Sequence, residues 1–78
     1  MNKIDYNKEL DCTGLSCPLP VLKTKKMVDS MNHGEILKMN STDPGSKNDI
    51  TSWIESSENE LLSMDQDGEK LIFFIKKA

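Results

Sequence analysis

The chain of 78 residues is long enough for one small domain and leaves no room for a second. Hydrophobic residues make up 36% of it and charged residues 29%, which is the balance of a folded globular protein rather than a disordered one. No apolar run approaches the roughly 18 residues of a membrane span, and the first residues contain no signal-peptide core. We therefore expect a single cytoplasmic domain, residues 1–78, with no membrane contact.

The charge is unevenly distributed along the chain. The net charge is −3, and all ten basic residues are lysines. Because arginine supplies most planar recognition of bases and phosphates, its absence argues against direct nucleic-acid binding. Residues 1–28 carry five lysines against three acids, whereas residues 40–69 carry one lysine against eight acids. We interpret the acidic stretch as solvated surface.

The first two predicted elements are a strand and a helix. Residues 3–11 alternate poorly but permit a half-buried strand. Its buried face would be formed by Ile4, Tyr6 and Leu10. Residues 18–31 have the periodicity of an amphipathic helix, and Gly34 is suited to the left-handed cap that would end it. The buried arc of this helix would contain Pro20, Val21, Thr24, Met27, Val28 and Met31.

A second strand and a second helix follow. Residues 35–42 look like a strand, and the Asp-Pro-Gly sequence after it is turn chemistry, in which Asp43 would form an Asx hydrogen bond. Ser46 followed by Asp49 resembles a capping box at the start of a helix. The apolar stripe of that helix would contain Ile50, Trp53 and Ile54.

The last predicted unit is a hairpin around Asp67-Gly68, a two-residue turn signal between two apolar runs. A symmetric turn there pairs Met64 with Leu71, Leu62 with Phe73 and Leu61 with Phe74. The predicted fold is therefore a two-layer α/β sandwich with the order β-α-β-α-β-β. In it, two helices cover one face of a mixed four-stranded sheet.

The most informative segment is DCTGLSCPLP, residues 11–20. Pro18 and Pro20 would break a helix interior, but they fit its first turn, where N–H groups have no intrahelical partner. Cys17 then falls at the cap of the helix. Because the pKa of a thiol falls at helix N-termini and near lysines, we expect the pKa of Cys17 to be modestly lowered. The position by itself leaves open a nucleophilic thiol and an incidental capping cysteine.

The stretch GLSCPLP at residues 14–20, with Asp11 ahead of it, resembles the signature of the TusA/SirA-like sulfur-carrier family. Members of that family carry a Cys-Pro-x-Pro motif at the start of their first helix. The similarity covers nearly all of the chain from residue 10 onward, including Thr-Asp-Pro-Gly-Ser at residues 42–46. It implies the same β-α-β-α-β-β fold. It also implies that Cys17 carries sulfur as a persulfide, with Gly14, Pro18 and Pro20 as motif residues.

The resemblance further implies a sulfurtransferase in the stoichiometric sense, with no cofactor. Cys17 would receive sulfur from a donor such as a cysteine desulfurase or a rhodanese-like protein, and would pass it to an acceptor protein. Relatives serve tRNA thiolation, molybdenum-cofactor enzymes, sulfur oxidation or selenium metabolism, and this sequence does not choose among them. We expect a monomer in isolation, since the hydrophobic pattern needs no partner to close the core.

Two further groups of residues lie near the motif. Cys12 could act as a resolving or auxiliary thiol for Cys17, or could face the core from the end of its strand.

Four side chains on the solvent side of the first helix predict a docking patch in which lysines steer an acidic partner. They are Leu19, Leu22, Lys23 and Lys26. The alternative is that single exposed leucines are normal and lysines solvate a face.

No metal site is expected, because Cys12, Cys17 and His33 are the only soft or imidazole ligands in the chain. We interpret His33 as a surface residue at a helix end.

Two other functions stay open at this point. One is a thiol–disulfide redox switch that uses Cys12 and Cys17, and the other is a non-catalytic regulatory or RNA-associated module.

Overall fold

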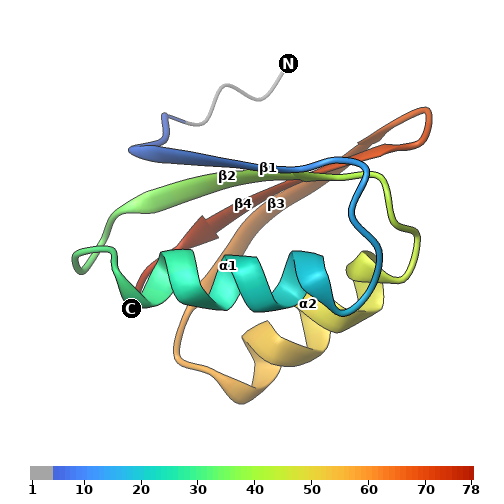
Figure 1. Ribbon diagram of the computed structural model, residues 1–78. Helices are drawn as coiled ribbons and strands as arrows, with labels where there is room; N and C mark the ends of the chain where they lie inside the picture. The colour runs from blue at the N-terminus through green and yellow to red at the C-terminus, as the bar shows by residue number, and fades with distance from the viewer. Residues whose placement is uncertain (1–4) are drawn as a thin grey trace.

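A computed structural model describes residues 5–78, and its elements follow the predicted order β-α-β-α-β-β (Figure 1). The sheet has the strand order β1-β2-β4-β3, in which β1 runs parallel to β2 and the other two pairs are antiparallel. Both helices cover one face of this sheet (Figure 1), so the predicted fold class is confirmed. The bounds are β1 Lys8–Cys12, α1 Leu19–Asp29, β2 Ile36–Ser41, α2 Ser46–Ser56, β3 Glu60–Asp67 and β4 Lys70–Lys76.

Strand β1 is shorter than predicted. Leu10 packs against the core beneath the helices. Tyr6 precedes the strand and lies against Phe74, with the ring centroids 6.1 Å apart, while the Lys38 ammonium sits 5.3 Å from the Tyr6 ring. The prediction that Tyr6 and Leu10 share a face was wrong, because strand alternation begins only at Lys8. Ile4, the third member of that set, lies outside the described residues.

Helix α1 buries the arc that its periodicity predicted. Pro20, Thr24 and Val28 are buried, and the Thr24 hydroxyl donates a hydrogen bond of 2.7 Å to the Pro20 carbonyl. The helix ends at Asp29, earlier than predicted, where the N–H of the cap residue Ser30 points back to the carbonyls of the last turn. The proposed cap at Gly34 was therefore wrong. That glycine has a φ of 84° in the turn that leads into β2.

The start of α2 differs from the predicted capping box. Gly45 is the N-cap residue, and no side chain of residues 5–78 caps the helix by a hydrogen bond. Ser46 lies inside the first turn, where its hydroxyl donates to the Asp43 carbonyl at 2.6 Å. The Asp49 side chain is directed instead toward the loop before α1. The apolar stripe is confirmed, since Ile50 is buried and Trp53 and Ile54 pack against the core.

The hairpin closes one residue later than predicted. Gly68 and Glu69 form the turn, and Gly68 has a φ of 63°, as the first position of a type II′ turn requires. The observed partners are Met64 with Phe73, Ser63 with Phe74 and Leu61 with Ile75, so the predicted register was wrong. A bulge lies between Leu61 and Ser63, and both Leu61 and Met64 pack against the core.

The parallel pairing of β1 with β2 decides where the two helices begin. The paired strands end together, Cys12 beside Ser41. The loops that follow them, residues 13–18 and 42–45, therefore leave the sheet at the same end, and each leads into a helix. In Figure 1 both helices start at this end of the molecule.

Candidate functional site

Two hydrogen bonds tie the loop before α1 to the loop before α2. The N–H of Gly14 donates to the Thr42 hydroxyl at 2.9 Å, and the N–H of Cys17 donates to the Asp43 carboxylate at 3.0 Å. The prediction that Asp43 forms an Asx bond in its own turn was therefore wrong, because its carboxylate serves the neighbouring loop. These bonds hold the backbone of Cys17 against the start of α2.

The loop before α1 is also fixed internally. The Asp11 carboxylate accepts hydrogen bonds from the N–H and the hydroxyl of Thr13, at 3.0 and 2.7 Å, and these bonds lower the pKa of Asp11. Gly14 has a φ of 81°, which a residue with a Cβ rarely adopts. The sequence Asp-x-Thr-Gly thus forms a tight turn that redirects the chain from the sheet toward the helix.

Cys17 lies one residue further from α1 than predicted. The N-cap residue is Pro18, and Pro20 occupies the second helical position, where its missing N–H costs no intrahelical bond. The first bond of the helix runs from the N–H of Leu22 to the Pro18 carbonyl at 3.1 Å. The peptide bond between Cys17 and Pro18 is cis. Since Pro18 is the N-cap residue, Cys17 lies just ahead of the helix, and it is exposed.

The Cys17 sulfur meets a carboxylate rather than free amide groups. Its thiol donates to Oδ2 of Asp49, in the first turns of α2, with an S–O distance of 2.8 Å. This hydrogen bond raises the pKa of Cys17, with further contributions from desolvation and from the negative charges of Asp49 and Asp43. Our expectation of a lowered pKa was therefore wrong. A bond to the neutral thiol and two nearby carboxylates outweigh the favourable field of the helix start.

Sequence reasoning missed Asp49 as a site residue. It assigned this acid to a cap because the residue lies three positions after a serine. The available signal was topological, since loops that follow parallel strands emerge at one end of a sheet. An acid in the first turns of α2 therefore comes close to the residue before α1.

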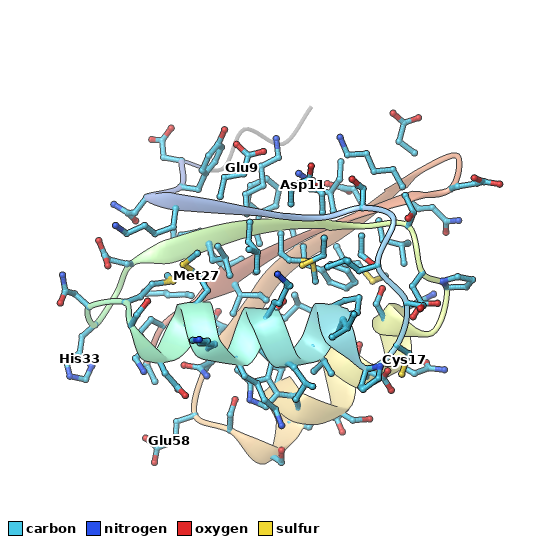
Figure 2. The ribbon with its side chains drawn as sticks, in the orientation of Figure 1. Glu9, Asp11, Cys17, Met27, His33 and Glu58 are labelled. Carbon is cyan, nitrogen blue, oxygen red and sulfur yellow. The ribbon has the colours of Figure 1, made fainter. Side chains whose placement is uncertain are left out.

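A shallow groove runs from Cys17 between the two helices. It has a volume of about 360 Å³. Its lining residues are Cys17, Pro18, Val21, Lys25, Asp49, Ser52, Trp53 and Ser56. Figure 2 shows Cys17 at the end of the molecule where α1 begins, with its sulfur directed away from the sheet. The groove is open and has room for atoms added to the sulfur.

The exposed face of α1 carries the predicted apolar side chains. Leu19 is 44% exposed and Leu22 is 51% exposed, and Tyr6 is the only other large hydrophobic residue exposed within residues 5–78. Lys23 and Lys26 are exposed on the same helix. The structure thus places two apolar side chains in solvent within the first turns after Cys17.

Comparison with known proteins assigns the chain to a family. The profile described as sulfurtransferase TusA matches residues 8–77. The chain belongs to the TusA family. The sulfur carrier protein TusA of Allochromatium vinosum is 42% identical over 74 residues, which cover 95% of this chain and 97% of that protein. YrkI of Bacillus subtilis is also 42% identical, over 72 residues that cover 92% of this chain and 96% of that protein.

A solved structure shows the same fold. The crystal structure of a SirA-like protein from Desulfitobacterium hafniense superimposes with a TM-score of 0.72 at 20% sequence identity. The superposition covers 90% of this chain and 96% of that chain. The β-α-β-α-β-β sandwich of this TusA-family chain is therefore one that an experimental structure also adopts.

The second cysteine of this TusA-family chain is in a different environment. Cys12 is free, completely buried at the end of β1, and part of the hydrophobic core. Burial raises the pKa of Cys12. The structure therefore gives Cys12 the core position that was one of its two sequence interpretations, and a role in resolving a persulfide stays a prediction.

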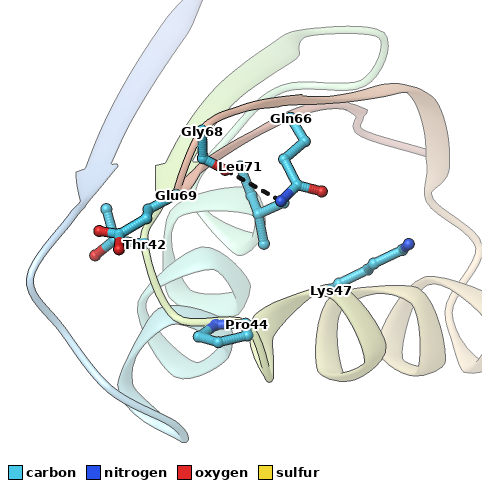
Figure 3. A pocket seen from close by; sticks show the side chains of 7 residues that line it. All are labelled: Thr42, Pro44, Lys47, Gln66, Gly68, Glu69 and Leu71. Atoms are coloured by element: carbon cyan, nitrogen blue, oxygen red, sulfur yellow. Dashed lines mark hydrogen bonds between the residues drawn. The ribbon is translucent and has the colours of Figure 1, made fainter.

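The remaining candidates lie apart from Cys17. His33 is at the opposite end of α1 (Figure 2), where Nδ1 contacts the Ala78 carbonyl. Within residues 5–78, no three His, Cys, Asp or Glu side chains are grouped as metal ligands, and no helix has the length and apolar character to cross a bilayer. A cavity of about 430 Å³ lies under the hairpin turn and contains neither cysteine (Figure 3).

Proposed function

We propose that the chain is a sulfur carrier that accepts sulfane sulfur as a persulfide on Cys17 and passes it to an acceptor protein. The observation that carries this proposal is the exposed Cys17 thiol, which opens into a groove at the start of the first helix in a TusA-family chain. A relative with 42% identity is named a sulfur carrier protein. The proposed donor is a cysteine desulfurase or a rhodanese-like protein.

The proposed reaction is thiol exchange at sulfur. The Cys17 thiolate attacks the terminal sulfur of the donor persulfide, so that a new S–S bond forms on Cys17 and the donor cysteine leaves as a thiolate. In delivery, a thiolate of the acceptor attacks the terminal sulfur on Cys17, and the electron pair of the broken S–S bond returns to the Cys17 sulfur. Neither step needs an external oxidant or reductant.

The surroundings of Cys17 suit presentation to other proteins. The groove is shallow, and two loops fix the Cys17 backbone while leaving its sulfur open to solvent. We assign partner docking to the exposed face of α1, where Leu19 and Leu22 supply apolar contact and Lys23 and Lys26 attract an acidic surface. The motif residues Gly14, Pro18 and Pro20 shape the turn and the helix start.

The proposal is tested by intact-mass measurement after incubation with a cysteine desulfurase and cysteine, or with a rhodanese and thiosulfate. The wild-type chain should gain one or more sulfur atoms that a thiol reductant removes. Cys17→Ser should abolish this gain, and Cys12→Ser should retain it.

A mass loss of two hydrogens that either substitution prevents would instead support a Cys12–Cys17 redox switch. That switch has less structural support, because Cys12 is completely buried.

A further inference from the structure

We infer that Asp49 favours release of sulfur from Cys17, because its carboxylate stabilises the empty carrier and loses its hydrogen bond when the carrier is loaded. This inference rests on the proposed persulfide on Cys17 and assigns a role to a second residue of the same site. It concerns the balance between holding and delivering sulfur.

In the empty carrier, the Cys17 thiol is in contact with a carboxylate. The Cys17 thiol donates to Oδ2 of Asp49 at 2.8 Å, and the two residues come from positions 32 apart in the sequence. Two carboxylates act on this thiol, Asp49 from α2 and Asp43 from the loop before α2, and Lys25 of α1 lines the same groove. The carboxylate that touches the sulfur therefore acts on the reacting atom itself.

Loading removes the proton on which this hydrogen bond depends. In a persulfide the Cys17 sulfur is bonded to carbon and to a second sulfur, so it has no hydrogen to donate. An ionised carboxylate accepts hydrogen bonds only, so Asp49 and the loaded sulfur face each other as two acceptors. The added sulfur stands about 2 Å further out, and its negative form meets the charges of Asp49 and Asp43. Each of these changes favours the empty state.

The hydrogen bond from Cys17 to Asp49 changes the equilibrium of the delivery reaction. The persulfide of Cys17 and an acceptor thiol exchange to give the Cys17 thiol and the acceptor persulfide, with one S–S bond broken, one formed and the proton count unchanged. The Cys17 sulfur recovers an electron pair and a proton, and its S–H again donates to Asp49. Since the bond is present on the product side alone, Asp49 shifts this equilibrium toward delivery.

The test compares the wild-type chain with Asp49→Asn and Asp49→Ala. Asp65→Asn is the matched control, because it removes the same charge from an exposed position on β3. Each variant is equilibrated with glutathione persulfide and glutathione at fixed ratios, and intact mass gives the loaded fraction. We expect the two Asp49 variants to hold sulfur about threefold to tenfold more strongly than wild type, the range for a charge-assisted hydrogen bond near solvent. Asp65→Asn should match wild type.

A second readout follows the empty carrier. The rate of Cys17 alkylation by iodoacetamide is measured against pH, and both Asp49 substitutions should move its midpoint to lower pH. Thermal unfolding checks that the Asp49 variants fold. If they do not fold, Asp43→Asn is measured in their place. It should move the alkylation midpoint in the same direction by a smaller amount. Equal loaded fractions and unchanged midpoints would overturn the role of Asp49. A wild-type chain that takes no sulfur from donor proteins would overturn the proposed function instead, while the alkylation midpoints still decide whether Asp49 acts on Cys17.

Discussion

Cys17 lies between two opposing influences. Its place ahead of a helix favours the thiolate, whereas the hydrogen bond to Asp49 and the nearby Asp43 charge favour the neutral thiol and raise its pKa. The raised pKa makes the Cys17 thiolate scarcer at neutral pH than it is in free cysteine. A neutral thiol is a weak nucleophile, so in the proposed function the empty carrier reacts slowly with unspecific alkylating and oxidising agents.

The two cysteines should react differently with alkylating agents. At pH 8, native protein should gain one iodoacetamide adduct, on exposed Cys17, and denatured protein should gain two, because Cys12 is buried in the core. Since the pKa of Cys17 is raised, its thiolate is scarce below the ordinary midpoint of about 8.5 and increases only as pH rises beyond it. Peptide mapping and a rate profile from pH 6 to 10 give both results. A midpoint below that of free cysteine would contradict the assigned influence of Asp49.

The two sides of helix α1 lie in different environments. Its buried arc, including Thr24 and Val28, packs on the sheet, while Leu19 and Leu22 extend into solvent near Cys17. In the proposed docking, burial of these leucines contributes apolar contact area, and Lys23 and Lys26 speed encounter with an acidic surface. In the proposed function, the helix positions Cys17 and presents the docking surface beside it.

Leu19→Asp tests the docking face. Transfer of sulfur from a donor protein should slow by about five- to thirtyfold, because a charge replaces an apolar contact of about one to two kcal/mol. Tyr6→Asp is a matched control, since Tyr6 is also 44% exposed but lies against Phe74 rather than on α1. The measurements are the initial rate of persulfide formation and the unfolding curve. Equal slowing by both substitutions, or by neither, would remove the docking role from this face.

The whole fold brings the two halves of the site together. Cys17 precedes α1 and Asp49 belongs to α2, and they meet because β1 and β2 are parallel neighbours that finish at the same end of the sheet. The sheet is thus the rigid support for two loops, which the bonds from Gly14 to Thr42 and from Cys17 to Asp43 join. One hydrogen bond fixes the backbone of Cys17 and another joins its thiol to Asp49, while the residue stays exposed.

Thr42→Val tests the bridge between the loops. Valine keeps the shape of threonine but cannot accept the bond from the N–H of Gly14, so the free energy of unfolding should fall by about 0.5–1.5 kcal/mol. Hydrogen exchange should become faster at the amides of Gly14 and Cys17. Amides in β4 should change their exchange rates only as far as the lower free energy of unfolding of the whole domain requires. Chemical denaturation and amide-resolved exchange measure the two effects. An unchanged exchange rate at Cys17 would show that the Asp43 contact alone holds this loop.

The sequence by itself determined the element order, the buried arc of the first helix and Cys17 as the candidate nucleophile. These depend on local rules, namely the periods of helix and strand and the tolerance of proline in a first helical turn. The tertiary structure alone decided the hairpin register, since the turn forms at Gly68-Glu69 rather than at Asp67-Gly68 and a bulge between Leu61 and Ser63 shifts the pairing of Leu61. It also decided the direction in which the pKa of Cys17 shifts. The acid that controls this thiol lies 32 positions away, and only strand pairing brings the two side chains into contact.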